Sequence, residues 1–234
     1  LFDEMEFNPA YLIIIGRSFL LAVAATIISL IIGFPVAYYI SRQRDSVKNI
    51  LIFLVTIPFW TNLLIRTFAW IIILGKDGVI ENSFGFIGII DDDDSLNLMY
   101  TNTAILIGLV YSYIPLMVLP IYSSMEKLDV RLIEAASDLY STRINLIFKI
   151  ILPLTLPGII GGSILVFVPC LGAFIAPDLL GGGKKLLLGS LIQFQFAYAR
   201  NWPFGAAIAM VLLALIVTIL YLNARVNRRH EQNA

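Results

Sequence analysis

Polar and aromatic side chains interrupt long apolar stretches of this 234-residue chain, at places where they would lie at membrane depth. Their chemistry is hydrogen bonding, charge pairing and contact with a ring face. Ionisable and amide groups are expensive within a bilayer and usually face protein or a water-filled cavity. We therefore expect a solute pathway lined by residues of these kinds: Trp60, Asn62, Asp178, Gln193 and Trp202.

Two of these positions also have a plainer interpretation. Trp60 is equally typical of the aromatic belt at a membrane interface, and Asp178, which follows Pro177, could simply begin a loop. Pro58 lacks an amide hydrogen and so frees a backbone carbonyl close to Trp60, which favours a local polar site.

No catalytic or metal-binding site is predicted. The run 181–185 (GGGKK) does not fit a phosphate-binding loop, since that pattern requires Gly where Asp178 stands and Ser or Thr where Lys185 stands. We therefore expect that the chain does not hydrolyse ATP and binds no cofactor. The acidic run 91–94 has no spacing typical of a metal site, and we interpret it as a solvated loop.

The elements that hold these residues must be membrane-spanning helices. The chain is 59% hydrophobic with a mean hydropathy of +0.88, and a helix needs about 20 apolar residues to cross hydrocarbon. Continuous apolar runs favour helices over a barrel, so the sequence predicts an all-α integral membrane protein. Five crossings are expected, at residues 11–40, 47–74, 101–122, 145–172 and 204–222. Within the fourth, Gly158, Gly161 and Gly162 are predicted points of close helix packing.

Charge sets the expected orientation. Most lysines and arginines fall on one side if the loop after the first span is cytosolic, and this side includes Arg42, Arg44, Arg228 and Arg229. The C-terminus is then cytoplasmic and the start lies outside. A protein that begins in the cytosol would need a sixth helix before Leu1, which we expect to be missing from this sequence. The formal net charge of zero argues against a nucleic-acid partner.

A polar island separates the third and fourth spans on the cytosolic side. Its charged and apolar residues alternate as in a short amphipathic helix outside the membrane. Small and leucine side chains permit close approach to a partner's groove, although a solvated surface helix is the alternative. The residues expected to dock are Arg131, Leu132, Glu134, Ala135, Ala136, Asp138 and Leu139.

The island also carries a family pattern. Glu134-Ala135-Ala136, followed by Ile150, Leu152 and Pro153, resembles the signature of permease subunits of bacterial ABC importers, in which it forms a coupling helix that fits a cleft in the ATPase. Tyr140 stands where the family has Gly, which would cost about 1–2 kcal/mol if a left-handed turn is needed there.

This resemblance implies one permease domain over residues 1–234, with the coupling loop at about 126–146. It implies four partners: a cytoplasmic ABC ATPase that uses ATP-Mg, a second permease that is identical or similar, a periplasmic or extracellular solute-binding protein, and the lipid of the bacterial cytoplasmic (inner) membrane.

Longer stretches resemble the polyamine (spermidine/putrescine) branch of these permeases, among them residues 58–66, 119–129 and 202–207. The resemblance implies a cationic amine as substrate, with Trp60 as an aromatic wall and Asp178 meeting an ammonium group. Arg66 would repel such a substrate and is expected to pair with a carboxylate or cap a carbonyl. The alternatives are a permease for another small organic solute, an ion-coupled secondary transporter, whose inverted repeats are not evident, and a membrane scaffold.

Overall fold

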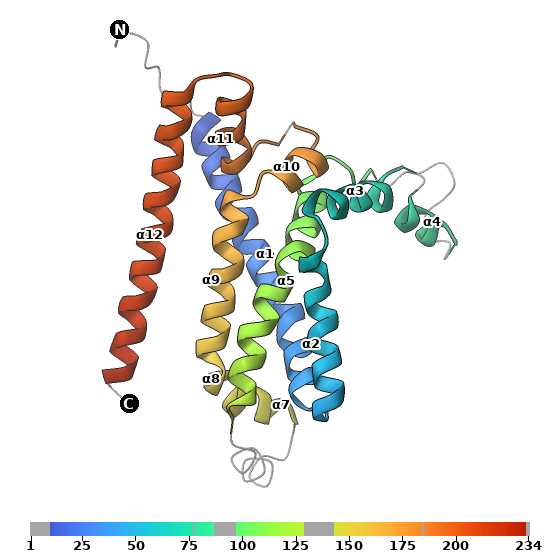
Figure 1. Cartoon of the computed structure of the whole chain (residues 1–234), viewed down its shortest axis with the longest axis vertical. Helices are drawn as coiled ribbons and strands as arrows, with labels where there is room; N and C mark the ends of the chain where they lie inside the picture. The colour runs from blue at the N-terminus through green and yellow to red at the C-terminus, as the bar shows by residue number, and fades with distance from the viewer. Residues whose placement is uncertain (1–9, 77, 87–96, 129–142, 184, 233–234) are drawn as a thin grey trace. The chain divides into compact units, whose positions relative to one another are not determined.

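The computed structural model describes residues 10–76, 78–86, 97–128, 143–183 and 185–232 (Figure 1). These ranges contain helices and turns and no strand, which confirms the predicted all-α class. The helices are α1 (Ala10–Ser41), α2 (Asp45–Trp60), α3 (Leu63–Leu74), α4 (Val79–Phe86), α5 (Asn102–Glu126), α7 (Arg143–Leu146), the π-helix η1 (Ile147–Ile151), α8 (Leu152–Leu154), α9 (Leu156–Gly172), α10 (Ile175–Leu180), α11 (Leu188–Ala197) and α12 (Trp202–Gln232).

Three of the described helices, α1, α5 and α12, are long and apolar enough to cross a membrane on their own. Two pairs of shorter helices pass the same test only when each bent pair is taken as one span, which gives up to five spans among the described residues. The expected number of crossings is consistent with this result. The second and fourth spans, however, are broken.

The second span breaks after α2. Thr61 leaves the helical region at φ −91° and ψ 146°, and its hydroxyl donates a 2.8 Å hydrogen bond to the carbonyl of Pro58. Asn62 then starts α3, because its Oδ1 accepts a 2.8 Å bond from the backbone N–H of Leu64. Interpreting residues 47–74 as one span therefore misses a local change of direction at the residues expected to line a pathway.

The fourth span breaks at Thr155, where the segment Ile147–Leu154 is bent by 65° from α9. Thr155 is fully buried, and its Oγ1 donates to the carbonyl of Ile151 over 2.8 Å. Pro157 has no N–H to donate to the carbonyl of Pro153, so one hydrogen bond of the helical ladder is missing across the break, although Thr155 keeps its own backbone bonds to Ile151 and Ile159. A π-helix next to such a break is a feature that often marks functional sites.

Contacts divide the chain into two compact units, each assembled from distant segments. The first unit holds residues 1–22, 67–105 and 168–234, and the second holds residues 23–66 and 106–167. In the first, the backbone N–H of Leu188 donates a 2.8 Å bond to Ser18 Oγ, and the rings of Tyr11 and Phe204 meet edge to face at 5.3 Å. These contacts join α1 to α11 and α12.

In the second unit, α5 packs against glycines of two other helices. A Cβ placed on Gly33 of α1 or on Gly162 of α9 would lie 3.0 Å from atoms of Met117. A Cβ on Gly158 would lie 2.5 Å from the carbonyl oxygen of Pro120, and closer still to Ser124 Oγ. The predicted close packing is thus found at Gly158 and Gly162. It is wrong for Gly161, which faces open space within 4 Å in the described structure.

Candidate functional site

Two predicted pathway residues stand at the break between α2 and α3, in the second unit. Trp60 ends α2 with 84% of its surface exposed, so its ring faces are open to a ligand. Asn62 is exposed, but its side-chain oxygen already caps α3. Nearby, Nε and Nη1 of Arg66 are buried without a hydrogen-bond partner among the described residues, so the predicted pairing is not found for these two atoms.

The other three predicted residues lie in the first unit, on helices linked in sequence and in space. Asp178 is a half-buried residue of α10, Gln193 a half-buried residue of α11, and Trp202 begins α12. Helix α11 contacts both α10 and α12. The Oε1 atom of Gln193 is buried and has no hydrogen-bond partner among the described residues. Trp202 is 65% exposed and meets the edge of Phe196 at 6.3 Å. The first unit therefore places acid, amide and indole groups on consecutive elements.

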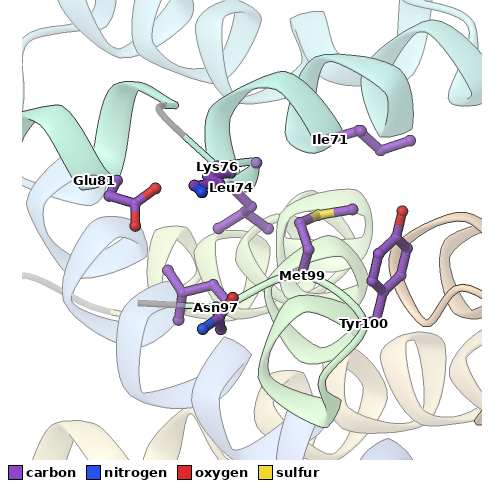
Figure 2. Close-up of a pocket in the computed structure, with 9 residues that line it drawn as sticks. Ile71, Leu74, Lys76, Glu81, Asn97, Met99 and Tyr100 are labelled. Carbon is purple, nitrogen blue, oxygen red and sulfur yellow. The ribbon is translucent and has the colours of Figure 1, made fainter. Parts of the chain in front are cut away.

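A cavity of about 310 Å³ lies between the end of α3, the start of α4 and the segment before α5 (Figure 2). Figure 2 shows Lys76, Glu81 and Asn97 toward one end and Ile71, Met99 and Tyr100 toward the other, so a charged end faces an apolar one. These residues are not among the predicted site residues. They come from two segments within residues 71–100, and no local pattern marks them.

The wall of this cavity is fixed to α10. Tyr100, at φ 62°, donates its backbone N–H to the carbonyl of Leu180 over 2.9 Å. Its ring occupies the space that a side chain at Gly182 would need, and Gly182 itself has a φ of +62°. Because α10 also carries Asp178, the cavity wall and this predicted acid belong to one connected piece of the first unit.

A second polar group lies at the other end of α5. Lys48 Nζ donates to Glu126 Oε1 over 3.3 Å, and the hydroxyl of Tyr122 donates to the same oxygen over 2.7 Å. We call Lys48, Tyr122 and Glu126 the basal cluster. Asp45 lies 3.5 Å from Lys48 but its side chain is 97% exposed. From the sequence, the positive-inside rule only assigns Lys48 to the cytosolic side. It counts basic residues and does not predict which acid each of them pairs with.

The predicted ATPase-coupling residues, Arg131, Leu132, Glu134, Ala135, Ala136, Asp138 and Leu139, lie outside the described residues. Their flanks are described. Helix α5 ends at Glu126, and α7 begins at Arg143 and leads into the π-helix.

Comparison with known proteins agrees with this architecture. Residues 25–231 match the family model described as binding-protein-dependent transport system inner membrane component, and the chain belongs to that family. It is thus the membrane-spanning permease subunit of a binding-protein-dependent ABC importer.

Particular relatives are similar over most of the chain. The spermidine/putrescine transport system permease protein PotB of Haemophilus influenzae is 43% identical, over 96% of this chain and 79% of that protein. PotB of Escherichia coli K12 is 41% identical, over 94% of this chain and 80% of the relative. A bacterial ABC transporter that imports alginate matches the fold with a TM-score of 0.66 at 17% identity, over 91% of this chain and 78% of that one. The family resemblance seen in the sequence is confirmed.

Proposed function

We propose that this permease carries polyamines such as spermidine and putrescine. The observation that supports the substrate class is the identity of more than 40% with two permeases named for these solutes, over at least 94% of the chain. Polyamines are flexible cations, so a pathway for them needs carboxylates, neutral acceptors and aromatic faces more than it needs a rigid pocket.

The candidate residues supply these groups. The open ring of Trp60 can attract an ammonium group by about 0.5–2 kcal/mol. Asp178 offers a carboxylate, and Gln193 Oε1 is an acceptor whose hydrogen-bonding capacity is not used by the described residues. Trp202 adds a second exposed aromatic face. Asn62 fits a structural role better, since its oxygen caps α3.

Energy enters through a separate subunit in this proposal. A cytoplasmic ABC ATPase closes on ATP-Mg and moves the segment around Glu134, and the spans then open the pathway toward a loaded solute-binding protein. This chain binds no cofactor and is not an enzyme. A second permease, identical or similar, completes the pathway. The chain lies in the bacterial inner membrane with its C-terminus in the cytoplasm.

The test is transport by the complete complex in proteoliposomes. The permease pair and the ATPase are reconstituted, and the binding protein is added with spermidine, putrescine, neutral amino acids or sugars. We expect ATP hydrolysis and uptake to be stimulated by the two amines. Stimulation only by a neutral solute would overturn the polyamine assignment and leave the importer class intact.

Coupling is tested in the same system with Glu134→Lys. We expect this variant to insert and assemble normally while ATP hydrolysis no longer drives uptake, because the reversed charge spoils the fit of this segment to the ATPase. Coupled uptake at the unsubstituted level would refute the proposed role of Glu134.

A further inference from the structure

The end of α5 contacts α1 and α2 in the second unit. Glu126, the last residue of α5, binds Lys48 in the first turn of α2 over 3.3 Å. One residue earlier, Met125 Sδ lies 3.9 Å from the hydroxyl of Ser41, the last residue of α1, which donates its hydrogen to the carbonyl of Tyr38 over 2.8 Å. The base of α5 is therefore joined to both sides of the short turn between α1 and α2.

The ion pair at this point differs from an ordinary surface pair. Exposed pairs contribute little because water screens them and both side chains lose freedom. Here the Lys48 side chain is only 15% exposed and Tyr122 is 8% exposed, while the Glu126 side chain that accepts from both is 49% exposed. The hydroxyl of Tyr122 shares the same carboxylate oxygen, so one oxygen accepts two hydrogen bonds and its position is fixed from two helices.

The opposite side of α5 is held by a different kind of contact. Gly158 of α9 lies against Pro120 and Ser124, where a Cβ would be 2.5 Å from the Pro120 carbonyl oxygen. This glycine follows the break at Thr155 by one turn. Close backbone packing resists sliding, so the last turns of α5 are held by α9 on one side and by Lys48 of α2 on the other.

We propose that the basal cluster is a positioning site for energy coupling, in which Glu126 holds the end of α5 to α2 so that α5, α2 and the α1–α2 turn move as one body. The inference rests on the proposed coupling role of the segment that follows α5, because that segment begins within a few residues of Glu126. A displacement applied there would otherwise bend α5 alone. With the cluster intact, the displacement reaches the helix that ends at Trp60, where the predicted pathway begins.

The experiment measures solute taken up per ATP hydrolysed by the complete complex in proteoliposomes. Glu126→Gln keeps the size of the side chain and removes its charge, and Lys48→Met removes the other charge. We expect each to lower the uptake-to-ATP ratio by about threefold or more. Tyr122→Phe removes one hydrogen bond without changing charge, and we expect a smaller fall in the same direction.

Two further variants separate positioning from general damage. Asp45→Asn removes an exposed carboxylate 3.5 Å from the same lysine, and we expect it to leave the ratio unchanged. The exchange Lys48→Glu with Glu126→Lys restores opposite charges across the two helices, and we expect it to recover most of the lost ratio. The yield of assembled complex and its thermal midpoint are recorded for every variant.

Three results would overturn the proposal. The first is an unchanged ratio in both Glu126→Gln and Lys48→Met. The second is a fall in uptake and ATP hydrolysis in proportion to lost complex, which would make the cluster only structural. The third is an equal fall in Asp45→Asn. Glu134→Lys, measured alongside, keeps the two ideas distinct: if it uncouples transport while the cluster variants do not, the positioning role fails and the proposed function stands.

Discussion

The close approach of α9 to α5 in the second unit makes a sharp prediction about Gly158. A Cβ added there would lie 2.5 Å from the Pro120 carbonyl oxygen and nearer still to Ser124 Oγ. The carbonyl belongs to the backbone of α5, so it cannot turn away as a flexible side chain would. In contrast, a Cβ added to Gly161, three residues along the same helix, would meet no atom of the described residues within 4 Å.

These geometries predict opposite changes in the free energy of unfolding when Gly158 and Gly161 are each replaced by alanine. Replacing a helical glycine by alanine usually stabilises by about 0.5–1 kcal/mol, because alanine loses less backbone entropy on folding. Forcing an extra methyl group into a packed contact costs about 1–3 kcal/mol. We therefore expect Gly161→Ala to be neutral or slightly stabilising and Gly158→Ala to lower the free energy of unfolding by roughly 1–2 kcal/mol net.

Gly162 provides an intermediate point. Its Cβ would lie 3.0 Å from both the carbonyl oxygen and Sδ of Met117, and the thioether can shift where the carbonyl cannot. Gly162→Ala should therefore destabilise less than Gly158→Ala. The three alanine variants on one helix thus form a graded series that composition and helix propensity alone would not produce.

The assay is thermal unfolding of the detergent-solubilised chain, at one scan rate for all variants because unfolding of such proteins is often irreversible. For a chain of this size, a loss of 1–2 kcal/mol corresponds to a midpoint lower by about 2–8 °C. A Gly158→Ala midpoint equal to or above that of Gly161→Ala would refute the close crossing of α9 and α5.

Three other changes test other parts of the structure. Gly182→Ala should lower the thermal midpoint, because an alanine at φ +62° costs about 1–2 kcal/mol and its methyl group would strike the Tyr100 ring; an unchanged midpoint would contradict this packing. Ser18→Ala should destabilise by about 1–3 kcal/mol by leaving the buried N–H of Leu188 without its 2.8 Å acceptor, and faster hydrogen exchange at that amide would report it. Asp178→Asn should raise the KM for polyamine uptake by about tenfold with little change in kcat if its carboxylate binds an ammonium group; an equal KM would remove it from the pathway.

The positions of the spans are predictable from sequence because bilayer thickness fixes the length of an apolar helix. The breaks within two spans are not. Pro58, Pro153 and Pro157 mark places where the backbone ladder weakens, but a proline can kink a helix or end it. The outcome depends on the hydrogen bonds that form around the break, and here the hydroxyls of Thr61 and Thr155 donate to the carbonyls of Pro58 and Ile151.

Partners across space are harder still to predict. Lys48 and Glu126 are 78 residues apart, and nothing local in either segment indicates that they meet. Gly158, Gly161 and Gly162 of the fourth span look alike in sequence, yet only the face turned toward α5 requires the absence of a side chain. Such distinctions need the neighbouring helix, which periodicity alone does not identify.

The polar residues predicted to line a pathway fall into two groups according to their hydrogen bonds in the structure. An amide in an apolar span has to satisfy its own polar atoms, and Asn62 does so locally by capping α3. Gln193 differs, because its buried Oε1 has no partner among the described residues. A buried acceptor left unpaired costs about 1–3 kcal/mol, so a movement that opened Gln193 Oε1 to a donor would recover energy that Asn62, whose oxygen is already paired, could not recover. Polar residues at membrane depth are therefore the candidates for a pathway, and those whose polar atoms have no partner in the described structure are the stronger candidates.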